Sequence, residues 1–173
     1  MKPLRNHADA EAMILNAMEL ECLYATDRAD ELSKAAELLT VWLEQDRDSE
    51  DSAPESIAIL VRDRYQRDAV VNGLAQHGVE VRAVDREAAG RGRPVVMTMH
   101  RAKGLEFRKV LLFDVSKNAI PRSLRDQQYS DADRDDALLR ERSLLYVAAT
   151  RARDQLAISW SGEASPLITA LAP

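Results

Sequence analysis

The sequence has one cysteine, few aromatic residues and no long apolar run, and each of these absences narrows the class of protein. A single cysteine, Cys22, excludes an internal disulfide and a cluster of thiolate metal ligands. Aromatic residues make up 5% of the chain, so we do not expect a dedicated surface for stacking nucleic-acid bases. No stretch approaches the ~20 apolar residues of a transmembrane helix, and the N-terminus lacks the apolar core of a signal peptide. We therefore expect a protein of the cytoplasm, without a membrane partner.

Excess positive charge and metal-ligand spacing are also lacking. The net charge is −5, which argues against a protein coated in basic surface but is compatible with one local basic groove. The three histidines, His7, His77 and His100, are scattered and follow no ligand spacing, so no metal site is predicted. With 46% hydrophobic and 31% charged residues over 173 positions, the composition is that of a single globular domain.

Strands and helices alternate along the chain, which predicts a mainly parallel sheet covered by helices on both faces. The apolar runs predict strands at residues 19–25, 57–61, 79–84, 95–99, 110–115 and 155–161. Helical spacing predicts helices over 26–46, 63–78, 135–152 and 165–172. We expect residues 1–18 to be a tail or the end of a truncated upstream region, and residues 19–173 to form the domain.

Charged side chains stand where the expected elements end. Arg62 follows the strand 57–61, the segment "TMHRAKGLEF" (98–107) follows the strand 95–99, and Arg151 closes the long helix. Ligands of open parallel sheets bind at the carboxyl ends of strands. Taken singly, however, such arginines are most often solvated surface residues, and such a segment is more often a polar turn around Gly104. Position alone therefore leaves the function open.

Three segments together resemble motifs of the UvrD/Rep-type superfamily 1 DNA helicases. The segment "TMHRAKGLEF" resembles motif V, and "RERSLLYVAATRARDQL" (140–156) resembles motif VI. The segment "IAILVRDRYQRDAVVNGLAQHGVEVRAV" (57–84) resembles the motif IV region with its following helix and strand. The order and the strand context agree, over most of residues 19–161. The resemblance implies the C-terminal RecA-like domain, a P-loop NTPase-type three-layer fold that lacks its own P-loop.

The resemblance implies a nucleotide site that this chain would complete from one side. Arg62 and Arg151 would point at the γ-phosphate of ATP, as the permanent charge and planar fork of arginine suit phosphate oxygens. An arginine finger of this kind is worth roughly 10³–10⁵ in rate. Glu106 would accept a hydrogen bond from the ribose, with Lys103 and Gly104 beside the nucleotide.

The resemblance also implies a track for single-stranded DNA. Thr98, His100 and Arg101 would donate to backbone phosphates. Lys103 would lie between the nucleotide and the DNA, linking closure of the cleft to movement of the strand. The charged loop would thus face two polyanions.

Two family features are missing. No G-x-x-x-x-G-K-[ST] segment occurs, so ATP and Mg²⁺ would be held by an N-terminal P-loop domain in the same or another chain, and this chain alone is expected to be inactive. Only residues 85–94 stand where family members insert a large accessory domain. One alternative is a stand-alone, non-catalytic module with a helicase-like fold that binds nucleic acid or protein. A free-standing enzyme with its own small substrate ranks last, because no nucleophile–base pair is evident.

Overall fold

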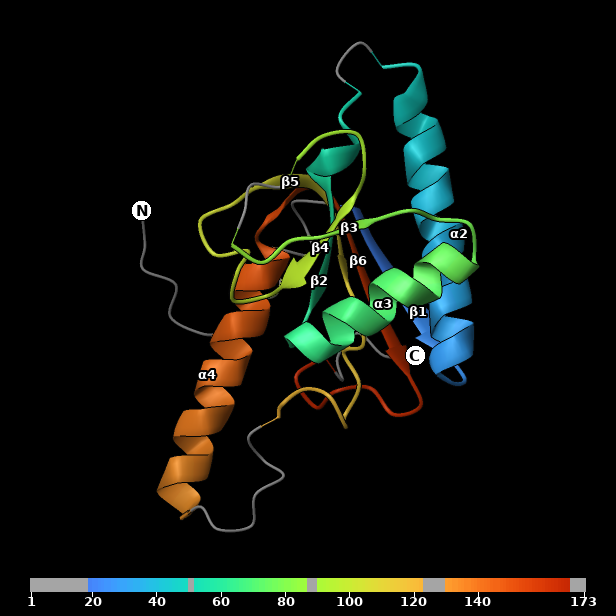
Figure 1. Cartoon of the computed structure of the whole chain (residues 1–173). Helices are drawn as coiled ribbons and strands as arrows, with labels where there is room; N and C mark the ends of the chain where they lie inside the picture. The colour runs from blue at the N-terminus through green and yellow to red at the C-terminus, as the bar shows by residue number, and fades with distance from the viewer. Residues whose placement is uncertain (1–18, 50–51, 87–89, 123–129, 169–173) are drawn as a thin grey trace.

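The computed structural model of the protein describes residues 19–49, 52–86, 90–122 and 130–168. Its elements are β1 (Glu19–Ala25), α2 (Arg28–Arg47), the 3₁₀ helix η1 (Pro54–Ser56), β2 (Ile57–Val61), α3 (Arg64–Gln76), β3 (Arg82–Ala83), β4 (Val95–Thr98), β5 (Phe107–Leu112), α4 (Asp131–Ala149) and β6 (Ala152–Ser161) (Figure 1). The six strands form a parallel sheet in the order β1-β6-β5-β2-β4-β3. The expected α/β class is confirmed. The expected tail, residues 1–18, lies outside the described residues.

Two apolar clusters lie on opposite faces of the sheet and make it the middle of three layers. On β2, Ile57, Ile59 and Val61 pack with α2 and α3, whereas Ala58 and Leu60 face the cluster that contains residues of α4. All five residues of β2 are buried, as expected for a central parallel strand covered on both faces. Figure 1 accordingly shows α2 and α3 on one side of the sheet and α4 on the other.

Side-chain caps explain where the described α-helices begin. Asp27 and Asp63 accept the N–H groups of the third helical residues, Asp30 and Gln66, at 2.9 Å. Such caps satisfy backbone donors that the first helical turn leaves unpaired. Ser130 likewise caps α4, so this helix begins at Asp131, four residues earlier than expected.

Several other boundaries differ from those expected, and the last strand, β6, begins at Ala152, three residues earlier than expected. The strand expected at 79–84 is the shorter β3, whose residues Arg82 and Ala83 pair with Val95 and Val96 of β4. The strand expected at 110–115 is β5, Phe107–Leu112, and it stops before Asp114, whose φ of 60° is incompatible with a strand. Residues 165–168 form turns rather than the start of a helix, and the rest of the expected helix 165–172 lies outside the described residues.

None of the described helices is long and apolar enough to cross a bilayer.

Candidate nucleotide and nucleic-acid site

The connection between β4 and β5, residues 99–106, runs from the carboxyl ends of the parallel strands back to their amino ends. These two ends of the sheet are called the carboxyl edge and the amino edge below. β4 ends at Thr98 on the carboxyl edge, and the parallel strand β5 starts at Phe107 on the amino edge. The turn is closed locally, because the hydroxyl of Thr98 accepts the N–H of Arg101 at 3.2 Å. The guanidinium of Arg101 donates to the carbonyl of Asp85 at 2.6 Å. Two of the residues expected on the DNA track therefore also hold the turn in shape.

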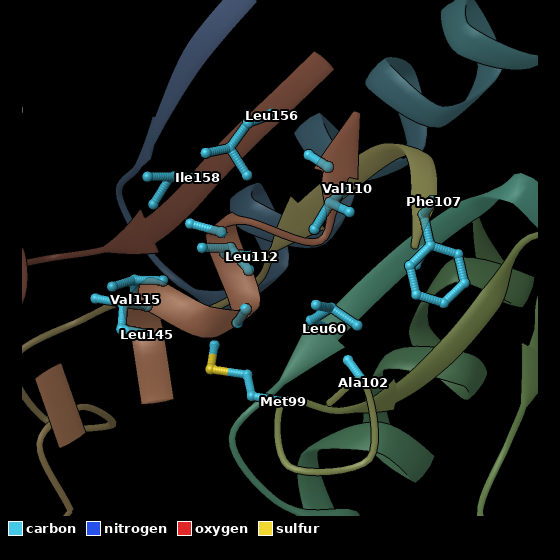
Figure 2. Packing of buried hydrophobic residues seen from close by; sticks show 14 of the residues in the cluster. Leu60, Met99, Ala102, Phe107, Val110, Leu112, Val115, Leu145, Leu156 and Ile158 are labelled. Carbon is cyan, nitrogen blue, oxygen red and sulfur yellow. The ribbon is translucent and has the colours of Figure 1, made fainter. Parts of the chain in front are cut away.

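Buried apolar residues anchor this connection and leave its charged side chains outside. Met99 and Ala102 are fully buried, and Figure 2 shows them among the packed side chains of the core. Gly104 has a φ of 82°, a conformation that side-chain-bearing residues rarely adopt. The exposed residues of the segment are His100, Lys103, Gly104 and Glu106. The expected polar face of the motif V segment is thus present.

Arg151 is held by neutral oxygen atoms. Its guanidinium donates to the carbonyls of Val147 and Leu105, both at 3.1 Å, and to the hydroxyl of Thr150 at 3.3 Å. Its own carbonyl accepts the N–H of Phe107 at 2.9 Å, which ties the end of α4 to the start of β5. Across the described ranges, no carboxylate forms an ion pair with Arg151. Its orientation is therefore fixed without neutralising its charge.

Arg62 is held by a buried carboxylate. Its Nε and Nη2 atoms donate to the two oxygens of Glu141 in α4, at 3.0 and 2.5 Å. The side chains are 16% and 7% exposed, so solvent screens this fork-on-fork pair only weakly. The backbone N–H of Arg62 also donates to Gln66 at 3.0 Å. Both the side chain and the backbone of Arg62 are thus fixed by other elements.

An open cavity of about 350 Å³ lies beside this ion pair. Its lining includes the ionisable side chains of Arg62, His100, Arg140, Asp133, Asp136 and Glu141. The structure therefore brings two expected site residues, Arg62 and His100, to one place. It adds an acidic wall from α4 that the sequence analysis did not anticipate.

The two arginines expected at the γ-phosphate lie at opposite edges of the sheet. Leu60, near the end of β2, pairs with Leu112, whereas the start of β5 pairs with the start of β6, Ala152. Arg62 and Arg151 thus stand about eight residue rises apart, or roughly 25 Å along the strands. The backbone positions of the two arginines are therefore not brought together within this domain. Arg151 shares its edge with Glu106, and Arg62 shares the other edge with Thr98 and His100.

A second buried polar cluster supports the carboxyl edge from the α2 side. Asp114, 3% exposed, accepts hydrogen bonds from Arg28, Gln66 and Ser116. Its backbone N–H donates to the fully buried Glu31 at 2.9 Å. Burial raises the pKa of Glu31, although a hydrogen bond from Ser159 acts in the opposite direction. Through Gln66, this cluster also supports the loop that carries Arg62.

The sequence analysis missed Glu141 and Asp114. The first carried a signal, because Glu141 stands four residues before Leu145 and so falls within the apolar stripe of a helix. A carboxylate at such a position needs a buried cation, which the spacing could not identify. Asp114 gave no signal, since its left-handed backbone is evident only in three dimensions. Among the described residues, no group of three or more potential ligands could hold a metal ion.

Comparison with known families places the motif V and motif VI segments in one domain. Residues 92–163 match the family model of the UvrD-like helicase C-terminal domain. UvrD2 of Mycobacterium tuberculosis, an ATP-dependent DNA helicase, is 37% identical over 86 residues. The Bacillus subtilis protein YjcD, whose name assigns it to the ATP-dependent DNA helicases, is 36% identical over 95 residues. These alignments cover 47% and 55% of this chain but only 12% and 10% of the two relatives.

Solved structures share the fold. The C-terminal domain of a possible DNA helicase from Lactobacillus plantarum superposes with a TM-score of 0.64 at 21% identity, over 97% of this chain and 91% of the other. The C-terminal domain of the DEAD-box protein Dbp5 gives 0.52 at 15% identity, over 86% and 79% of the chains.

The sheet order and these neighbours show a RecA-like fold. Over residues 92–163 the chain is more narrowly similar to the UvrD-like helicase C-terminal domain, as the two relatives are. The resemblance inferred from the motifs is confirmed at that level. The chain spans only about a tenth of the length of the curated relatives that it matches.

Proposed function

We propose that this chain is the C-terminal motor domain of an ATP-dependent superfamily 1 DNA helicase, in which it completes an ATP site formed mainly by an N-terminal P-loop domain. ATP and Mg²⁺ would be bound by that partner domain, since this sequence has no P-loop. The reaction would be ATP hydrolysis coupled to movement along single-stranded DNA. The relatives that match the chain are named as helicases of this kind.

The geometry of Arg151 carries this proposal. Charge that develops on a transferring phosphoryl group is stabilised most by a cation whose position is fixed in advance and whose charge is not already cancelled. Carbonyl and hydroxyl oxygens hold Arg151 in this way. The exposed carboxylate of Glu106 lies on the same edge and would accept the ribose hydroxyl, with Lys103 and Gly104 on the connection beside it. The amino edge would therefore be the nucleotide side.

The carboxyl edge would be the nucleic-acid side. Thr98, His100 and Arg101 lie there, at the end of β4. Arg62 joins them rather than Arg151, so we assign its charge to backbone phosphates of the DNA instead of to the γ-phosphate. Contacts of this kind position a strand without reading its sequence. One domain would then hold two polyanions at its two edges.

Reconstitution of ATP hydrolysis tests the proposal. The chain alone should not hydrolyse ATP, with or without single-stranded DNA. Adding it to a P-loop domain from a UvrD-like helicase whose own C-terminal domain has been deleted should produce DNA-stimulated turnover. Turnover by the chain alone, once contaminating helicase is excluded, would contradict the proposal. So would a failure to raise turnover with every P-loop domain that binds it.

A further inference from the structure

We propose that Thr150 is a positioning residue for Arg151, whose guanidinium its hydroxyl group holds in the orientation that phosphoryl transfer needs. This inference rests on the proposed function, because it takes Arg151 as the residue that acts on the nucleotide. It deepens that proposal by naming a neighbouring side chain on which the action of Arg151 depends. Thr150 would act through Arg151 and not through a contact of its own with the nucleotide.

One fork of the Arg151 guanidinium is filled by two oxygen atoms from the end of α4. Its Nε atom donates to the carbonyl of Val147 at 3.1 Å, and its Nη2 atom donates to the hydroxyl of Thr150 at 3.3 Å. The hydroxyl in turn donates to the same carbonyl of Val147 at 2.8 Å. Because the two acceptors are hydrogen-bonded to each other, they present a fixed pair of oxygens to the fork.

A third acceptor comes from the connection between β4 and β5. The Nη1 atom of Arg151 donates to the carbonyl of Leu105 at 3.1 Å. The N–H of Leu105 donates to the carbonyl of Ala102 at 3.0 Å, and Ala102 is fully buried, so this acceptor belongs to a turn that is anchored in the core. Of the three acceptors, the hydroxyl of Thr150 is the one that a side chain supplies. A substitution can therefore remove it without altering the backbone.

This arrangement leaves donors of Arg151 for a phosphoryl group. A guanidinium has five N–H groups, and the three acceptors engage one on Nε, one on Nη1 and one on Nη2. Each terminal nitrogen thus keeps one N–H that these acceptors do not use. A cation fixed in advance stabilises developing negative charge without having to reorganise during the reaction. Loss of one restraint should therefore slow the chemical step rather than weaken the binding of ATP.

Steady-state ATP hydrolysis by the reconstituted enzyme, at saturating single-stranded DNA, tests the inference. Thr150→Val keeps the branched shape of the side chain and removes the acceptor. We expect kcat to fall about tenfold, as for one lost hydrogen bond to a charged group. KM for ATP should stay within about twofold, because the lost interaction matters only in the transition state. Thr150→Ser restores the hydroxyl and should keep kcat within about twofold of the original chain.

Thr40→Val is the matched control. The hydroxyl of Thr40 also donates to a helix carbonyl, that of Ala36 at 2.8 Å. It lies on α2, on the opposite side of the sheet from α4 (Figure 1). The same substitution there should leave kcat unchanged. Both variants should lose a similar, small amount of thermal stability, because each gives up one hydroxyl bond to a helix carbonyl.

A double variant shows whether the hydroxyl acts through Arg151. In the Arg151→Ala background the fork is gone, so adding Thr150→Val should cause little further loss of turnover. A further loss of about tenfold in that background would mean that the two residues act independently. The positioning role would then be refuted.

The outcomes separate this inference from the proposed function. If Thr150→Val turns over as fast as the original chain while Arg151→Ala loses turnover, the positioning role is refuted and the proposed function stands. If Thr150→Ser loses as much activity as Thr150→Val, the hydroxyl is not the group that matters, and the inference is refuted in the same way. If the original chain raises turnover with no P-loop domain that binds it, the proposed function fails and the inference falls with it. Should Thr150→Val not fold, Thr150→Ala serves instead, with the same expected loss of kcat.

Discussion

The two edges of the sheet hold their arginines by different means. On the carboxyl edge, Arg62 is bound by the buried carboxylate of Glu141. On the amino edge, Arg151 is bound by two carbonyls and a hydroxyl. Either set of acceptors fixes a guanidinium, but only the neutral set leaves its full charge to act on a ligand. The difference favours Arg151 for stabilising a transition state and Arg62 for a contact that can be exchanged.

The largest effect on stability should come from the carboxyl edge, at Asp114. Asp114→Ala would leave Arg28, Gln66 and Ser116 without their shared acceptor and would keep a side chain at a φ of 60°. We expect a loss of about 2–4 kcal/mol in the free energy of unfolding, measured by urea titration. Asp68→Ala, which removes an exposed carboxylate paired with the neighbouring Arg67, should cost about 0.5 kcal/mol or less. Equal losses would show that the cluster does not stabilise this edge.

At the amino edge, Glu106→Ala should affect nucleotide binding rather than folding. The exposed carboxylate would lose its bond with the ribose, worth about 1.5–3 kcal/mol for a charged acceptor. In the reconstituted ATPase, KM for ATP should rise about tenfold or more with kcat nearly unchanged. Glu163→Ala removes an exposed carboxylate at the opposite edge, where it pairs with Lys117, and should leave KM as it is. A lower kcat without a change in KM would refute the ribose contact.

The matching test on the carboxyl edge is His100→Ala. Loss of one hydrogen bond to a backbone phosphate, about 1 kcal/mol, should weaken oligothymidylate binding about fivefold. Turnover at saturating DNA should change little. The control is His77→Ala, since His77 is an exposed residue at the end of α3 whose ring contacts the carbonyl of Gly73. Identical binding by the two variants would remove His100 from the track.

The smallest effect concerns pH. Burial raises the pKa of Glu31 in the folded protein, so the folded state favours the protonated carboxyl group. The stability that this preference contributes is complete below the pKa of the unfolded chain and is lost as pH rises through the folded pKa. Glu31→Gln removes a buried charge that is costly at pH 8. We expect Tm to rise by a few degrees at pH 8, where about 1 kcal/mol corresponds to roughly 2–4 °C, and the gain to vanish towards pH 4. A gain that is constant with pH would contradict this account.

Local signals in the sequence predicted most of the fold. The apolar run 57–61 and the helical spacing over 26–46 and 63–78 are short-range features, and the structure has a strand and two helices there. The errors arose where three-dimensional context decides, as at Asp114, where a left-handed residue ends β5 before the apolar run does.

The sequence proposed candidate site residues but could not give their arrangement. The motif segments identified Arg62, Glu106 and Arg151, yet a motif does not say at which edge of a sheet its residues lie. That depends on the register of β2, β5 and β6. The partner of Arg62 could not be predicted either, because Glu141 lies 79 positions away in sequence.

The most direct test of the two-edge account compares Arg151→Ala with Arg62→Ala in the reconstituted enzyme. For each variant, ATP turnover at saturating DNA and the affinity for oligothymidylate would both be measured. Arg151→Ala should lower turnover by about 10³-fold or more while DNA affinity is retained. Arg62→Ala should retain most of the turnover at saturating DNA. If Arg62→Ala abolished turnover as fully as Arg151→Ala, both arginines would act on the nucleotide and the separation of roles between the two edges would be wrong.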